Sequence, residues 1–102
     1  MPGVSESDLA GLRKAIDAVD SRLLELMAER IRLVLAVGAY KAKHDLPIYD
    51  PERERQLIER LTRSPPEPLE ADTVRRIFER LIDESRTLEQ RHGGRPPSKP
   101  GR

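Results

Sequence analysis

The 102-residue sequence contains no cysteine and no tryptophan, and its aromatic residues are two tyrosines and one phenylalanine. The lack of cysteine excludes disulfide bonds, thiolate metal ligands and a thiol nucleophile. Lys and Arg number 19 against 18 Asp and Glu, so the chain lacks the basic excess that is typical of nucleic-acid binders. No apolar run approaches the roughly 20 residues that a membrane-spanning helix needs. We therefore expect neither a nucleic-acid partner nor a membrane partner.

The segment from Met1 to Leu9 is polar and acidic and does not resemble a signal peptide, so we expect a cytoplasmic protein. The length suits one small domain. Hydrophobic residues and charged residues each make up 36% of the chain. Such a composition supports a thin aliphatic core, which favours amphipathic helices over packed sheets.

Apolar residues recur at intervals of three and four along the N-terminal part of the chain. They are Leu9, Leu12, Ile16, Val19, Leu23, Met27, Ile31, Val34 and Val37. This spacing predicts an amphipathic helix from about residue 6 to about residue 43. Ser5 or Ser7 is expected to be its N-cap, with Glu6 and Asp8 in the first turn, where the helix dipole favours acidic side chains.

A helix of this length would extend for about 57 Å, whereas a compact domain of this size has a radius of gyration of only about 13 Å. The rest of the chain cannot cover such a rod, so its apolar stripe needs a partner. The simplest partner is the same helix of a second copy in a two-fold dimer. A long coiled coil is the alternative, but the later residues also have helical patterns, which favours a packed bundle.

A second, short helix is expected after a connection over residues 44–49, because Pro47 disfavours helix in the residue before it. Asp50 is a good N-cap and Pro51 suits the first helical position. The helix is expected to end before Ser64. Its inward apolar residues are Leu57, Ile58 and Leu61.

A third helix of medium length is expected from about Glu70 to about Arg91, and glycines from Gly93 onward would terminate it. Its apolar set is Val74, Ile77, Phe78, Leu81, Ile82 and Leu88. Residues 93–102 are rich in Gly and Pro and basic, and we expect a disordered tail. The predicted fold is therefore all-α: one domain over residues 1–92, with one very long, one short and one medium helix in an intertwined helical-bundle homodimer.

Several polar residues share a helix face or a helix turn, at positions that suit a binding pocket. They are Arg30 with Lys41, Ser85 with Glu89, and Arg53 with Glu54 beside Asp50. Together they offer cations and a hydroxyl for carboxylates, and acidic acceptors for an alcohol. Arg13 lies about 25 Å from Arg30 along the predicted helix. In a crossed dimer, Arg13 of one chain can reach the site of the other.

Four segments, in order along about Leu9 to Gln90, resemble the short monofunctional form of the all-helical chorismate mutases. They are Leu12-Arg13 with Ile16-Asp17 and Asp20, Leu26-Met27-Ala28-Glu29-Arg30, Val37-Gly38-Ala39-Tyr40-Lys41, and Pro47-Ile48-Tyr49-Asp50-Pro51-Glu52-Arg53-Glu54. The third matches the family pattern Val-Gly-x-x-Lys, and the fourth resembles Pro-Val-x-Asp-x-x-Arg-Glu. The resemblance implies a homodimer that rearranges chorismate to prephenate in phenylalanine and tyrosine biosynthesis, without a metal or other cofactor.

The resemblance also implies roles for individual side chains, of which Lys41, Glu89 and Arg30 would be catalytic. Arg13 of the partner chain and Arg30 would clamp the two carboxylates of chorismate. Lys41 would contact a carboxylate and the ether oxygen, and Ser85 would help hold a carboxylate. Glu89 would face the ether oxygen.

By the same resemblance, Asp50 and Glu54 would receive the ring hydroxyl, with Arg53 nearby. Two sister activities on the same scaffold stay open: an isochorismate pyruvate-lyase, and a mutase acting on 4-amino-4-deoxychorismate. The presence of Asp50 and Glu54 favours a ring hydroxyl, although carboxylates also accept an ammonium. A non-catalytic helical dimer is the third alternative.

Glu89 departs from the pattern of the bacterial members, which commonly have Gln at this place, whereas fungal members are similar in carrying Glu. An ionised carboxylate would repel the negative charge that develops on the ether oxygen, so Glu89 can help only when protonated. Burial would raise its pKa and nearby Lys41 would lower it. We therefore expect activity to rise toward acidic pH, unless Glu89 is merely a solvent-facing residue.

Overall fold

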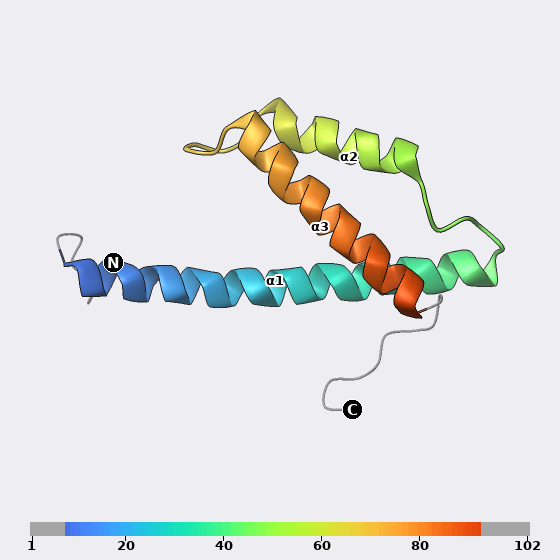
Figure 1. The fold of residues 1–102 in the computed structure, drawn as a ribbon, viewed down its shortest axis with the longest axis horizontal. Helices are drawn as coiled ribbons and strands as arrows, with labels where there is room; N and C mark the ends of the chain where they lie inside the picture. Colours follow the sequence, from blue (N-terminus) through green and yellow to red (C-terminus); the bar gives the residue numbers. More distant parts are fainter. Residues whose placement is uncertain (1–7, 93–102) are drawn as a thin grey trace. The chain divides into compact units, whose positions relative to one another are not determined.

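The computed structural model describes residues 8–92, which form three α-helices and no strand (Figure 1). These are α1, Leu9–Lys43; α2, Pro51–Arg63; and α3, Ala71–His92. The predicted all-α class and the order long, short, medium are confirmed. The tail predicted for residues 93–102 lies outside the described residues. Within residues 8–92, no helix is both long and apolar enough to cross a bilayer.

The start of α1 differs from the prediction. The helix begins at Leu9, and the Asp8 carboxylate accepts a hydrogen bond from the Ala10 backbone N–H at 3.0 Å. The Asp8 carbonyl accepts the first helical bond, from the Leu12 N–H at 2.9 Å. Asp8 is therefore the N-cap rather than a first-turn residue, and the predicted serine caps and the start near residue 6 lie outside the described residues. The sequence offered several capping side chains close together, and the carboxylate nearest the apolar stripe is the one that binds the helix terminus.

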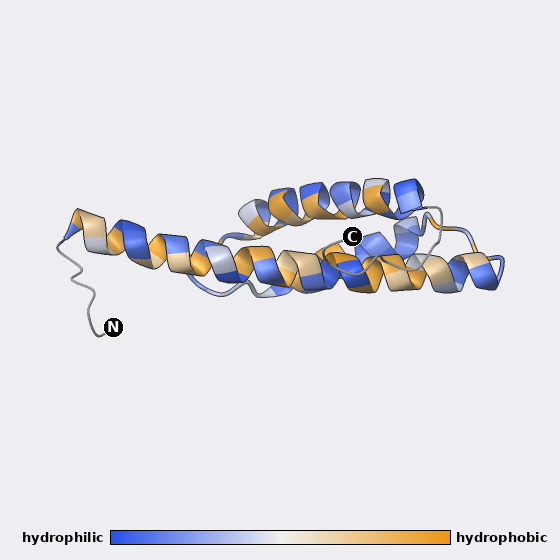
Figure 2. Cartoon of the chain, turned by 90° about the horizontal axis from the view of Figure 1, so that it is seen from below, coloured by the Kyte–Doolittle hydropathy of each residue, from blue (hydrophilic) through white to orange (hydrophobic). Residues whose placement is uncertain are grey.

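The described residues fall into two parts, 8–32 and 33–92. The first part is α1 up to Arg32, and hydrophobic residues recur along this helix in Figure 2. The apolar side chains of the predicted stripe from Leu9 to Met27 are exposed, from 39% for Leu12 to 61% for Leu9. The others of this stripe are Ile16, Val19, Leu23 and Met27.

The second part holds the end of α1, the connection after it, and α2 and α3. Asp45 stops α1 in the left-handed region at φ 60°, which a short polar side chain tolerates. The Leu46 N–H then donates to the Lys41 carbonyl at 2.8 Å. At the start of α2, the Asp50 carboxylate accepts from the Arg53 N–H at 3.1 Å, and Pro51 is the first helical residue. The predicted start of α2 is confirmed.

Helices α2 and α3 pack against each other through a small aliphatic core, to which Ile58, Val74 and Ile82 contribute buried side chains. Half-buried residues of the predicted apolar sets flank them: Leu57, Leu61, Phe78, Leu81 and Leu88. Ile77, which also belongs to the predicted apolar set of α3, is 55% exposed. It lies at the edge of the apolar face of α3.

Candidate active site

A glutamate is buried where α3 approaches the last turns of α1. The Glu89 side chain is 7% exposed, and it passes directly over Gly38, which is also buried. A Cβ atom at position 38 would lie 2.8 Å from Glu89 Cγ and 3.0 Å from Oε2. Only glycine leaves room for the carboxyl there. The alternative that Glu89 faces solvent is therefore wrong.

Burial raises the pKa of the Glu89 carboxyl above its ordinary value of 4.5, because the ionised form loses hydration. The charges of Lys41 and Arg86 act in the opposite direction, and the charge of Glu54 adds to the increase in the Glu89 pKa. Desolvation is the largest effect. The protonated carboxyl is therefore favoured at pH values where an exposed glutamate would be ionised.

Lys41 is a half-buried cation in the last turn of α1. Its Nζ donates a hydrogen bond to the Ile48 carbonyl at 2.9 Å, so the loop between α1 and α2 fixes the ammonium group. The Lys41 side chain is half-buried, and its charge lowers the pKa of Glu89. The sequence predicted Lys41 as a site residue but carried no signal for its anchor, which is a backbone atom.

Glu54 of α2 and Arg86 of α3 form an ion pair across the two helices. One guanidinium nitrogen, Nη2, donates to both carboxylate oxygens, at 2.5 Å to Oε1 and 2.6 Å to Oε2. Hydrogen bonding to Glu54 is the main cause that raises the pKa of Arg86. Sequence analysis missed Arg86, because its partner is distant along the chain and no motif links the two.

The other predicted residues of this part hold different positions. Asp50 is exposed and caps α2, and Arg53 is also exposed, in the first turn of that helix. Ser85 is buried at 4% exposure, and its hydroxyl donates to the Leu81 carbonyl at 2.6 Å. It is one helical turn from Glu89, as the sequence predicted.

Arg13 and Arg30 belong to the first part of the chain. Both lie on α1, where Arg13 is exposed and Arg30 is half-buried. The structure therefore brings together Lys41, Glu54 and Glu89 among the predicted residues, and adds Arg86.

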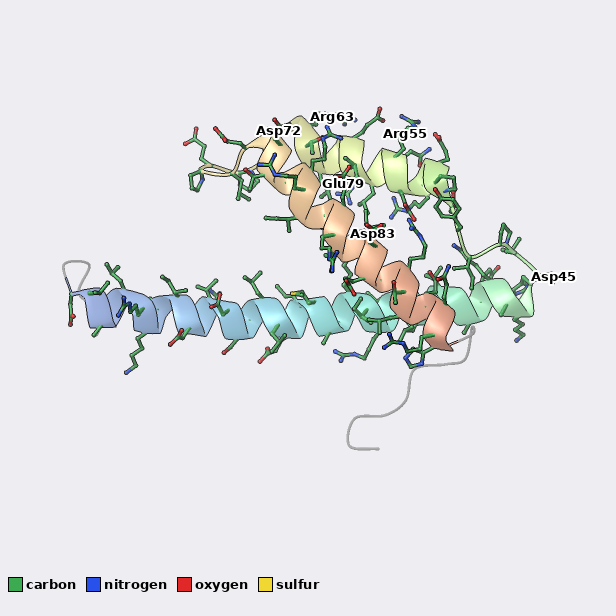
Figure 3. The ribbon with its side chains drawn as sticks, viewed as in Figure 1. Asp45, Arg55, Arg63, Asp72, Glu79 and Asp83 are labelled. Carbon is green, nitrogen blue, oxygen red and sulfur yellow. The ribbon has the colours of Figure 1, made fainter. Side chains whose placement is uncertain are left out.

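A groove of about 550 Å³ runs between α2 and α3. Arg55 of α2 and Glu79 and Asp83 of α3, all labelled in Figure 3, line it together with Glu54 and Arg86. Its walls are mixed in charge. Within residues 8–92 no group of three or more His, Cys, Asp or Glu side chains is placed to hold a metal ion.

The chemistry of this arrangement follows from the Lys41 and Glu89 pair. A fixed ammonium and a protonated carboxyl are both hydrogen-bond donors, and both stabilise an oxygen on which negative charge grows. The Glu54 carboxylate is an acceptor for a hydroxyl. Stabilising such an oxygen requires neither a nucleophilic side chain nor a covalent intermediate.

Comparison with protein families agrees with this reading of the residues. The family model described as chorismate mutase type II matches residues 12–90, which is most of the chain. The chain belongs to this family. Its match runs from the first turns of α1 to the end of α3, so it includes every predicted site residue.

Individual members of the chorismate mutase family resemble the chain over most of its length. It is 40% identical over 87 residues to the bifunctional chorismate mutase/prephenate dehydratase of Escherichia coli K12, covering 84% of the chain but 22% of that protein. It is 34% identical over 85 residues to the chorismate mutase of Methanocaldococcus jannaschii, covering 82% of the chain and 86% of that protein. The chain thus spans about a fifth of the bifunctional relative.

The fold is also shared with a solved structure of the family. A chorismate mutase (Form II) from Thermus thermophilus superposes with a TM-score of 0.79 at 37% identity. The superposition covers 81% of this chain and 94% of the other. The shared fold therefore extends over most of both chains.

The close contact between Gly38 and Glu89 predicts a stability effect that changes sign. Gly38→Ala should destabilise the protein by about 1–3 kcal/mol, because the new methyl group overlaps the Glu89 side chain. In a Glu89→Ala background the same change should stabilise it by about 1 kcal/mol, because alanine favours helix over glycine. Urea unfolding at fixed protein concentration measures both.

Gly11→Ala, at the other glycine of α1, is the matched control and should give the same change in both backgrounds. If Gly38→Ala also has the same effect with and without the Glu89 side chain, the described contact is wrong.

Proposed function

We propose that this protein is a chorismate mutase, which converts chorismate to prephenate for phenylalanine and tyrosine biosynthesis. The observation that carries the proposal is the fixed Lys41 together with the buried Glu89. The resemblance to the family implies that both face the ether oxygen of the substrate. In this reaction the ether C–O bond breaks as a C–C bond forms within one molecule. No group is transferred to the protein.

Catalysis would come from orientation and from electrostatic stabilisation. Arginine forks that grip both carboxylates would hold the enolpyruvyl chain over the ring, which can contribute several kcal/mol. Lys41 and protonated Glu89 would donate hydrogen bonds to the ether oxygen as its negative charge develops. Asp50 and Glu54 would accept from the ring hydroxyl, with Arg53 nearby, and Ser85 would help to hold a carboxylate.

The protein would act as a homodimer with shared sites. The exposed apolar residues of α1 between Leu9 and Met27 support this, because a stripe of this length in one chain needs a complementary surface. Arg13 of the partner chain and Arg30 of the same chain would complete each site. A cytoplasmic location, like the extent of the domain over residues 1–92, stays a prediction from the sequence.

The pKa of Glu89 predicts how activity depends on pH. Because the protonated form is the donor, kcat/KM for chorismate should rise as pH falls, and well above the Glu89 pKa it should decrease about tenfold per pH unit. Glu89→Gln should flatten the profile, since an amide donates at every pH. The assay follows chorismate disappearance and identifies the product across a pH series that begins near the ordinary glutamate pKa of 4.5 and extends past neutrality.

Glu84→Gln, on the same helix but exposed, is the control and should keep the pH dependence of the unaltered protein. A flat profile in the unaltered protein would remove the basis for a protonated Glu89. A product other than prephenate would indicate a sister activity instead of chorismate mutase activity. If chorismate is not consumed at any pH, the result would favour a non-catalytic dimer.

Shared sites predict complementation between two inactive variants. Arg13→Ala and Lys41→Ala should each lose most activity as homodimers. After joint unfolding and refolding, a mixed dimer would contain one intact site, built from Lys41 of one chain and Arg13 of the other. The mixture should recover about a quarter of wild-type activity, because half of the dimers are mixed and each has one of two sites intact.

If Arg13 acted in the site of its own chain, the mixed dimer would contain no intact site and no activity would return. Sedimentation equilibrium on the unaltered protein provides the control for assembly. A monomeric mass would contradict the dimer itself.

A further inference from the structure

The ion pair between Glu54 and Arg86 stands apart from the other ion pairs of the described residues. Its side chains are 29% and 27% exposed, whereas those of the Arg55 and Arg80 pairs are at least 54% exposed. It joins two helices, while those pairs lie within one helix turn. A partly buried, charge-assisted pair is stronger than a solvated one and holds its partners in place.

The surroundings of Arg86 fix the guanidinium in this position. It lies over the Tyr49 ring, with 4.7 Å between the guanidinium carbon and the ring centroid. The Asp83 carboxylate is 3.6 Å away on the same helix. An aromatic face and two carboxylates leave the guanidinium little freedom.

We propose that Arg86 is a positioning residue that neutralises Glu54 and thereby selects a ring hydroxyl over a ring ammonium on the substrate. The inference rests on the proposed function, in which Glu54 accepts from the substituent on the ring. Arg86 would not touch the substrate. Arg86 would set the orientation of the Glu54 carboxylate, which does touch the substrate, and the net charge of the pair.

The selectivity follows from charge balance. Chorismate carries two carboxylates, so an uncompensated Glu54 beside it would add repulsion to the hydrogen bond with the hydroxyl. With Arg86 in place, the pair is neutral, and its remaining lone pairs still accept from a hydroxyl. A ring ammonium gains little from a neutral pair, whereas it would form an ion pair with a free carboxylate.

The test compares kcat/KM for chorismate with that for 4-amino-4-deoxychorismate, whose ring carries the ammonium. Arg86→Gln removes the charge and should lower the ratio, chorismate over amino analogue, by about tenfold or more. Arg86→Lys keeps the charge and should retain most of the ratio. Glu54→Gln leaves Arg86 uncompensated and should raise the ratio, because the cation then repels the ammonium.

Two further variants separate selectivity from stability. Arg80→Gln, at an exposed ion pair of α3, should leave the ratio unchanged. In the Glu54→Gln background, Arg86→Gln should abolish the increase, as expected for residues that act through each other. Far-UV circular dichroism shows which variants fold. If Arg86→Gln does not fold, the Glu54→Gln measurement still tests the inference.

Equal loss of both activities in Arg86→Gln, or no increase of the ratio in Glu54→Gln, would overturn this inference and leave the proposed function intact. If the unaltered protein converts neither substrate, the proposed function fails, and this inference fails with it.

Discussion

The burial of the Glu89 carboxyl over Gly38 is the interaction on which the chemistry of the site depends. An ionisable group is placed out of water only where the backbone makes room for it, and here a helix without a side chain at position 38 does so. The desolvation that raises the Glu89 pKa is a cost to stability whenever the carboxyl is ionised, and it also makes a neutral donor available. Lys41, held by the Ile48 carbonyl, supplies the charged donor of the site.

The charges near the Glu89 carboxyl act on its pKa in opposite directions. Burial and Glu54 raise the Glu89 pKa, and Lys41 and Arg86 lower it. Arg86 and Glu54, which are bound to each other, act on the Glu89 pKa in opposite directions, and desolvation is the largest effect. The charge of the Glu54 carboxylate is thus balanced by Arg86, and burial favours the protonated form of Glu89.

Local signals predicted the helices well and the site in part. Proline at position 47, the Asp50 cap and the apolar spacing of α3 are properties of neighbouring residues, so the order and most bounds of the helices were predictable. The start of α1 was not, because several nearby side chains could cap it and only geometry selects Asp8. The family motifs include Lys41 and Glu54, so these two residues were predicted. Arg86 was missed because its ion pair with Glu54 forms only when α2 and α3 pack together. The proposed role of Arg13 depends on a second chain, which the apolar spacing of α1 predicts.

The titration of Glu89 in the free protein tests the central claim most directly. Carbon-13 NMR of the glutamate side-chain carboxyl carbons, assigned by comparison with Glu89→Gln, gives its pKa without reference to activity or to any substrate. The account predicts a midpoint above the ordinary value of 4.5, because burial outweighs the attraction of Lys41 and Arg86. A titration midpoint of Glu89 at or below 4.5 would show that its carboxyl ionises as an exposed glutamate does. That result would contradict a neutral donor in the site.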